Sequence, residues 1–151
     1  MTEQLSPLAL QALAVVKESG AIIGANHAHP HTIRHKGRID LVTETDIAVE
    51  AFLKERLATL APQAGFLAEE SAEDLSLPDT CWIIDPVDGT TNFAHGLPLT
   101  VTSVAYRLNG EIVLGIVNAP LLRECFIAEK GKGAWRNGER ISVSSVTACE
   151  N

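Results

Sequence analysis

Apolar positions follow a helical pattern in the first part of the chain. Residues 7–25 have apolar side chains at helical rather than alternating spacing, and Ser6 followed by Pro7 is a typical helix start. A second helix is expected at about residues 44–60, which are rich in Ala, Glu, Leu and Lys. The polar stretch at 26–38 predicts a loop or an irregular strand.

From residue 65 onward apolar side chains occur at every second position, which is typical of strands. Asn109-Gly110 and Asn137-Gly138 are strong signals for tight hairpin turns. The expected strands are 65–68, 81–84, 99–107, 111–120, 123–130, 133–137 and 139–143. The predicted fold is therefore α+β, with two helices packed on a mostly antiparallel sheet of about six strands. We expect residues 1–151 to form one domain.

Charge and cysteine content narrow the function classes. The formal net charge of −7 argues against a nucleic-acid-binding surface but not against a small phosphorylated substrate, because carboxylates can hold metal ions that supply positive charge. Cys81, Cys125 and Cys149 fit neither a zinc pattern nor a disulfide framework. The N-terminus lacks a signal-peptide pattern, and Lys17 and Glu18 interrupt the most apolar run. A cytoplasmic protein without a membrane partner is expected.

The most informative stretch is DPVDGTTNF, residues 85–93, which follows an apolar run. Pro86 disfavours a helical conformation at Asp85, so we expect a tight bend just past the strand. In such a bend Asp85, the Val87 carbonyl and Asp88 can face one point, which suits Mg²⁺. Gly89 lets the backbone approach a ligand, and a short helix at 90–94 would offer free N–H groups to a phosphate.

Each of these features also has a simpler structural interpretation. DPVDG alone is more often a solvated turn, and Asp46 alone is more often a favourable charge at a helix N-terminus. Adjacent strand residues point to opposite faces, so only one residue of the Glu69-Glu70 pair can easily join a site with Asp85. Solvated loop histidines are the better interpretation of His27, His29, His31 and His35. Cys81, Trp82 and Trp135 are expected in the core.

Four stretches carry a resemblance to a known family. They are DLVTETD at 40–46, LAEES at 67–71, WIIDPVDGTTNF at 82–93 and EKGKGAWRNGERISVS at 129–144. With them the chain resembles the N-terminal half of the inositol monophosphatase family, whose members are Mg²⁺-dependent, lithium-sensitive phosphatases. The resemblance implies a sugar-phosphatase-like N-terminal domain. Ala68 replaces the family's usual Gly before the paired glutamates.

The resemblance also implies a role for each matching residue. Metal ligands would be Glu69, Asp85, the Val87 carbonyl and Asp88, holding two or three Mg²⁺ ions, with Li⁺ as an inhibitor. Thr90, partnered by Asp46, would orient and deprotonate the attacking water. Substrate phosphate would be held by Asp88, Gly89 and Thr90. Lys36 or its neighbour His35 would lie near the metals.

The implied activity is hydrolysis of a small phosphorylated alcohol, such as inositol monophosphate, by metal-activated water. Histidinol phosphate, fructose 1,6-bisphosphate, NADP and phosphoadenosine phosphate are alternative substrates. Because the family's C-terminal half has no counterpart in these 151 residues, we expect this chain alone to bind Mg²⁺ weakly and to show little or no turnover. A homodimer is expected for the full-length protein. The competing hypothesis is a non-catalytic binding or assembly module that retains the metal loop.

Overall fold

The computed structural model describes residues 5–27, 33–36, 40–70 and 77–147, with the strands at 33–36 and 40–43 described by their backbone alone. Both predicted helices are present. Helix α1 spans Pro7–His27 and helix α2 spans Glu44–Leu60. The backbone N–H of Ala9 donates to the Ser6 hydroxyl at 3.2 Å, so Ser6 caps α1 as expected.

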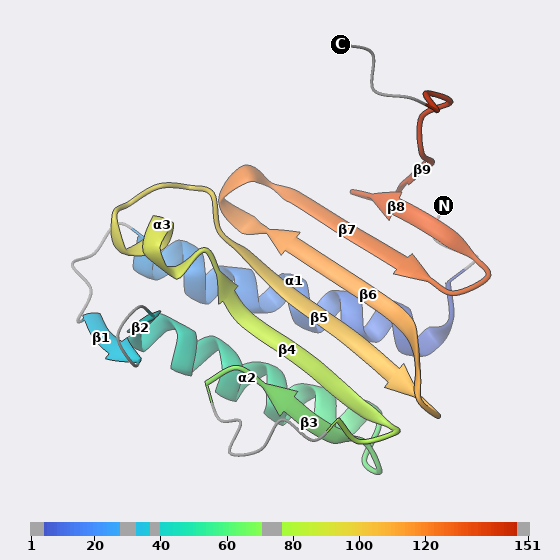
Figure 1. Ribbon diagram of the computed structural model, residues 1–151, viewed down its shortest axis with the longest axis horizontal. Helices are drawn as coiled ribbons and strands as arrows, with labels where there is room; N and C mark the ends of the chain where they lie inside the picture. The colour runs from blue at the N-terminus through green and yellow to red at the C-terminus, as the bar shows by residue number, and fades with distance from the viewer. Residues whose placement is uncertain (1–4, 28–32, 37–39, 71–76, 148–151) are drawn as a thin grey trace.

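The sheet has seven strands in the order β3-β4-β5-β6-β7-β8-β9, and all neighbours are antiparallel except β3 and β4. A separate antiparallel pair, β1 with β2, lies beside α3 and α2 (Figure 1). Two further short helices are α3 (Thr90–Ala94) and the 3₁₀ helix η1 (Pro120–Leu122). The strands are β1 (Ile33–Lys36), β2 (Asp40–Thr43), β3 (Gly65–Ala68), β4 (Cys81–Asp88), β5 (Val101–Leu108), β6 (Glu111–Ala119), β7 (Glu124–Glu129), β8 (Gly133–Arg136) and β9 (Glu139–Ile141).

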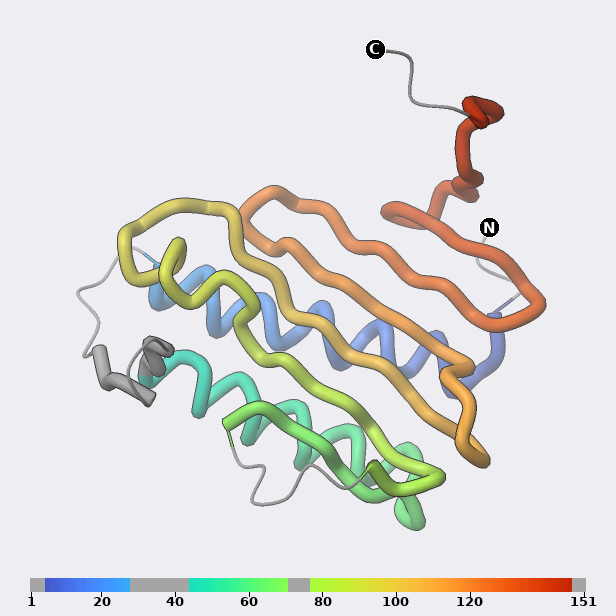
Figure 2. The backbone as a smooth tube through the Cα atoms, in the orientation of Figure 1, coloured from blue at the N-terminus to red at the C-terminus, as the bar shows by residue number. Residues whose placement is uncertain are grey.

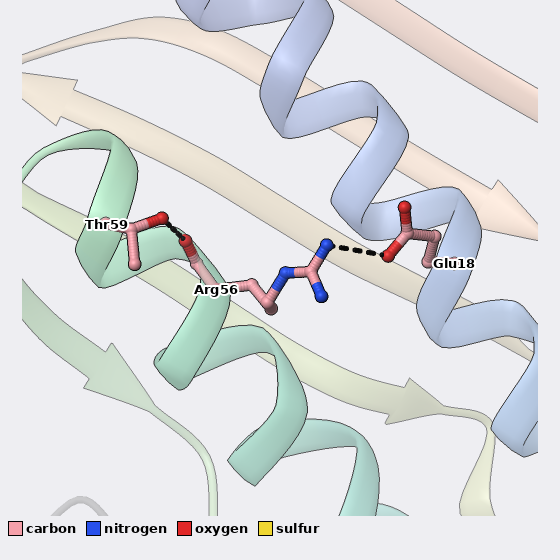
Figure 3. Close-up of polar contacts among 3 residues, drawn as sticks. All are labelled: Glu18, Arg56 and Thr59. Carbon is pink, nitrogen blue, oxygen red and sulfur yellow. Dashed lines mark hydrogen bonds and ion pairs between the residues drawn. The ribbon is translucent and has the colours of Figure 1, made fainter.

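Helices α1 and α2 lie side by side on the same face of the sheet, and in the described part of the chain no helix covers the opposite face (Figure 1). Between the two layers lies one apolar core, in which Trp82, Trp135 and Leu53 are among the fully buried side chains. Near the solvent edge, Arg56 of α2 pairs with Glu18 of α1 at 3.0 Å, and the Thr59 hydroxyl donates to the Arg56 carbonyl at 2.7 Å (Figure 3). The predicted α+β class is confirmed.

The sheet has seven strands, in line with the expected number of about six, and the short β9 pairs with β8 at its edge. Two other expectations need correction. β4 does not end at Ile84 but continues to Asp88, with a bulge where a bend was expected. By length and composition α1 could cross a membrane, although it packs against α2 and β6. One such helix is weak evidence for a membrane span, since a buried core helix meets the same criteria.

The tube trace follows the meander from β5 to β9 and then leads away from the sheet after β9 (Figure 2). Its turns have the geometry that the sequence predicts. Asn109 and Asn137 have φ of 53° and 50°, and the glycine after each also has positive φ, as type I′ hairpin turns require. The meander has one register shift, between Tyr106 and Arg107, and its first strand, β5, pairs with the strand that carries the acidic loop.

Candidate metal and phosphate site

The parallel pairing of β3 with β4 brings two acidic residues to one edge of the sheet. Ala68 pairs with Ile84, so Glu69 and Asp85 follow at the same end of the two strands. The Glu69 N–H donates to the Ile84 carbonyl at 3.2 Å and extends this pairing by one residue. Register therefore places both carboxylates next to each other, although they are 16 positions apart in the sequence.

A bulge replaces the expected bend in DPVDG. Asp85 pairs with Ser103 and Asp88 with Val101, so between these two pairs β4 has one residue more than β5. Pro86 has no N–H to donate to the ladder, which explains why regular pairing fails there. The Pro86 carbonyl instead accepts a hydrogen bond from the buried Thr102 hydroxyl at 2.9 Å. The bulge buries the Val87 side chain and leaves Asp88 exposed.

Gly89 links the bulge to α3 in a conformation that few other residues adopt. Its φ is 90°, and a Cβ placed on it would lie 2.8 Å from the Leu99 carbonyl oxygen. The chain can then turn directly into α3, whose first helical bond runs from the Phe93 N–H to the Gly89 carbonyl at 3.0 Å. The short helix expected at 90–94 is present.

Thr90 connects this loop to helix α2. Its hydroxyl lies 2.9 Å from the Val87 carbonyl oxygen and 3.3 Å from Oδ1 of Asp46. Asp46 lies in the first turn of α2 and is only 1% exposed. Because a hydroxyl has one hydrogen, Val87 and Asp46 compete for it. The structure thus places the Thr90 hydroxyl in contact with both the Asp46 carboxylate and the Val87 carbonyl.

Electrostatic repulsion is concentrated on Asp85. Burial, the largest cause, acts together with the charges of Glu69, Asp88 and Asp46 and a hydrogen bond to Glu69 to raise the pKa of Asp85 to about 7. Its Oδ1 is buried and has no hydrogen-bond partner. Crowded carboxylates of this kind are costly unless a proton or a cation neutralises them.

This donor set fits a hard divalent cation. All its donors are oxygens, which Mg²⁺ prefers, and the unpartnered Asp85 oxygen is a coordination position that no protein group uses. Within the described residues no three His, Cys, Asp or Glu side chains are gathered closely enough to hold an ion as they stand. The hydrogen bond between Asp85 and Glu69 gives a physical reason, because two carboxyl groups that share a proton cannot both face a cation.

Other candidate residues lie apart from this group. Lys36 is on β1 with His35, and their side chains are outside the described part, as are His29 and His31. We expected His27 to be a solvated loop residue, and this prediction is wrong. His27 ends α1, its ring lies 5.8 Å from the Phe93 ring, and its Nε2 is buried without a partner.

Glu50 is a residue that the sequence analysis missed. Its carboxylate accepts a hydrogen bond from the Glu70 N–H at 2.8 Å, next to the predicted metal ligand Glu69. The available signal was its position on α2, four residues after Asp46 and therefore on the same helix face.

A surface hollow of about 530 Å³ lies elsewhere, between α1, η1 and β7. Lys17, Arg123 and Cys125 line part of it, and no residue of the acidic group does. Burial raises the pKa of the Cys125 thiol, while the Lys17 charge opposes the rise, so this thiol is a poor nucleophile. The acidic group and this hollow therefore lie at separate places on the protein.

Comparison with known proteins places this arrangement in a family. The chain matches the model of the inositol monophosphatase family over residues 4–151. It is 48% identical over 139 residues to an inositol monophosphatase of Dictyostelium discoideum. The aligned region makes up 89% of this chain and 51% of that protein. The chain spans about half the length of the curated relatives it matches.

Solved structures agree with the family match. The extragenic suppressor protein suhB of Bartonella henselae superposes with a TM-score of 0.86 at 33% identity, covering 93% of this chain and 56% of that one. An IMPase/NADP phosphatase complexed with Mg²⁺ and phosphate gives a TM-score of 0.75 at 29% identity over 84% of this chain and 49% of that one. In sequence and in fold, this chain belongs to the inositol monophosphatase family.

Proposed function

We propose that the protein is a Mg²⁺-dependent phosphomonoesterase that hydrolyses a small phosphorylated alcohol. The observation that carries the proposal is the contact of the Thr90 hydroxyl with Asp46, directly beside the crowded Asp85. A hydroxyl and carboxylate pair next to a cation-binding group is what activation of water requires. Family membership supports the reaction class, and the whole protein's activity is part of the proposal.

Glu69, Asp85, Asp88 and the Val87 carbonyl would hold the metal ions. When bound, the ions would lower the pKa of the attacking water and neutralise charge on the phosphate oxygens. Asp85 would be the central ligand. Its pKa of about 7 and its unpartnered oxygen support this role, because a negative charge at this position is unfavourable until a proton or a cation neutralises it. Lys36 or His35 near the metals stays a prediction.

Thr90 and Asp46 would orient the water and take its proton. Asp46 is buried at the N-terminus of α2, where the helix dipole stabilises a negative charge. Thr90 can direct its hydrogen to Asp46 whenever the Val87 carbonyl is engaged elsewhere, and its oxygen then accepts from a water. Asp88 and the backbone N–H groups of Gly89 and Thr90 would hold the substrate phosphate.

Inositol monophosphate is the first substrate to test, because relatives and solved neighbours are named for it. NADP is a second candidate, since one structural neighbour is an IMPase/NADP phosphatase. Histidinol phosphate, fructose 1,6-bisphosphate and phosphoadenosine phosphate complete the panel. A homodimer, a cytoplasmic location and inhibition by Li⁺ also stay predictions.

The test is a phosphate-release assay with Mg²⁺, with the Dictyostelium relative as a positive control. The 151-residue chain should release phosphate from at least one substrate, more slowly than the relative and faster than its Asp85→Asn variant. Thr90→Val should abolish the release while binding of Mn²⁺, measured by electron paramagnetic resonance, is retained. Metal binding without any release above Asp85→Asn would favour the non-catalytic module instead.

A further inference from the structure

Helix α2 presents two buried carboxylates to the site. Asp46 is 1% exposed and Glu50 is 5% exposed, and at a spacing of four residues they lie on the same helix face. Asp46 contacts Thr90 in the loop after β4. Glu50 contacts the other acidic segment, because its Oε2 accepts the Glu70 N–H at 2.8 Å. One helix face therefore holds both segments that carry predicted metal ligands.

The Glu50 bond matters because Glu69 lies just beyond a short strand. β3 has four residues and ends at Ala68. On one side the Glu69 N–H donates to the Ile84 carbonyl at 3.2 Å, and on the other side the next N–H along the chain is held by Glu50. The Glu69 backbone is thus fixed between two hydrogen bonds, which limits where its carboxylate can point.

Lys54 makes a charged Glu50 tolerable in this buried place. Its Nζ lies 3.8 Å from Oε1 of Glu50, one helical turn further along α2. The same ammonium group lies 5.9 Å from the centre of the Phe66 ring on β3. The bond from Glu70 to Glu50 is therefore charge-assisted and stronger than a neutral one. An apolar residue of similar volume often stabilises a protein as well as a buried ion pair does. Stability alone therefore does not explain a glutamate at position 50, whereas positioning of the neighbouring acidic segment does.

We propose that Glu50 is a positioning residue that fixes the Glu69 carboxylate for metal binding by holding the Glu70 N–H. This inference rests on the proposed function, since it takes Glu69 as a metal ligand. Groups that orient a ligand from behind change metal affinity without touching the ion. Glu50 acts through the backbone of the neighbouring residue and is not itself a ligand in this proposal.

The test compares Mn²⁺ affinity among folded variants by electron paramagnetic resonance. Glu50→Met keeps the volume of the side chain but removes the acceptor, so affinity should fall roughly tenfold. Glu50→Gln keeps an acceptor oxygen, so affinity should stay close to that of the unaltered chain. Val49→Ala is the matched control, because it weakens packing of α2 at a fully buried neighbour without touching Glu70. Equal losses in Glu50→Met and Val49→Ala would overturn the proposal.

Amide hydrogen exchange of the metal-free chain gives a readout that does not depend on the ion. Exchange at Glu69 and Glu70 should accelerate in Glu50→Met, but not in Glu50→Gln or Val49→Ala. Unchanged exchange in Glu50→Met would overturn the proposal whatever the metal data show. If the unaltered chain binds no Mn²⁺ at all, the proposed metal site fails, and accelerated exchange in Glu50→Met would still support the hold on Glu69.

Discussion

Two regions of this protein are built on opposite principles. The site edge, made of α2, β3, β4 and α3, contains a bulge, a parallel strand pair and several carboxylates close together. The hairpin half, from β5 to β9, is an antiparallel meander with tight turns and a register shift of its own between Tyr106 and Arg107, but without a parallel pair. Among the described residues, the four buried side-chain atoms without a hydrogen-bond partner are His27 Nε2, Trp82 Nε1, Asp85 Oδ1 and Thr100 Oγ1. Two of them lie on β4 and none lies between β5 and β9.

Two carboxylates show the same contrast. Burial and neighbouring acids raise the pKa of Asp85 to about 7. Partial burial opposes ionisation of Glu129 too, but hydrogen bonds from Ser6 and the charge of Lys132 lower its pKa overall. Glu129 accepts the Ser6 N–H at 2.8 Å and pairs with Lys132 at 3.2 Å. At the site edge, the negative charge of Asp85 is unfavourable until a cation neutralises it. In the hairpin half, the negative charge of Glu129 is stabilised by its partners and holds Ser6 at the start of α1.

The largest effect should come from Asp85→Asn. Removing this carboxylate should weaken Mn²⁺ binding by about 100-fold or more, since even groups behind a ligand affect affinity by about 10–100-fold. The metal-free variant should be at least as stable as the unaltered chain near neutral pH, because one crowded charge is gone. Titration calorimetry and thermal melting measure the two quantities. Asp79→Asn, at an exposed loop position, is the matched control and should change neither.

Ile127→Ala should lower the stability of the fold without changing Mn²⁺ affinity, which is the opposite of Asp85→Asn. Ile127 is 3% exposed in β7, and truncating a buried Ile to Ala costs about 2–5 kcal/mol of unfolding free energy. Urea denaturation measures that loss, and Mn²⁺ affinity of the molecules that remain folded should not change. If Ile127→Ala does not fold, Ile127→Val should lose about 0.5–1.5 kcal/mol with the same result for the metal. A loss of affinity that parallels the loss of stability would show that the regions are not independent.

Sequence pattern was sufficient for the regular parts of the molecule. Helix α2 begins and ends where the pattern predicts, and both Asn-Gly turns form, because these features depend on residues close together in the chain. The parallel pairing of β3 with β4 was not predictable in this way. It joins segments separated by 12 residues, and short apolar strands do not specify their partners.

The candidate site was predicted only in part for a similar reason. Acidic residues at the ends of strands could be found from the sequence, and the family motif gave each one a role. Glu50 was missed although its spacing from Asp46 places both on one helix face, because an acidic residue in the middle of a helix is usually solvent-exposed. Its burial depends on how closely α2 packs against the end of β3. The partly buried His27 was missed because α1 extends further than its apolar pattern.

A pH series compares the two carboxylates directly. In the metal-free chain Asp85 binds its proton more tightly when folded, so its contribution to stability is complete below its ordinary pKa of 3.8 and is lost as pH rises towards 7. Glu129 has the reverse sign: its contribution is present above 4.5 and is lost as pH falls below that value. Asp85→Asn should therefore raise the melting temperature most at alkaline pH. Glu129→Gln should lower it near neutral pH and have little effect in acid, and two variants with the same pH profile would contradict the assignment.

The smallest effect, and the last test of the contrast, should come from Arg123→Gly. Arg123 follows η1 with a φ of 57°, a left-handed conformation that costs a residue with a side chain about 1–2 kcal/mol. Glycine removes this cost but is more flexible when unfolded, so the expected gain is about 0.5–1 kcal/mol in denaturation experiments. Leu122→Gly, one residue earlier at an exposed position without positive φ, should destabilise by a similar amount. Because Arg123 lies outside the site edge, its strain serves no metal ligand, and Mn²⁺ affinity should be unchanged. A stabilised variant that binds Mn²⁺ less well would mean that strain in the hairpin half also contributes to the site.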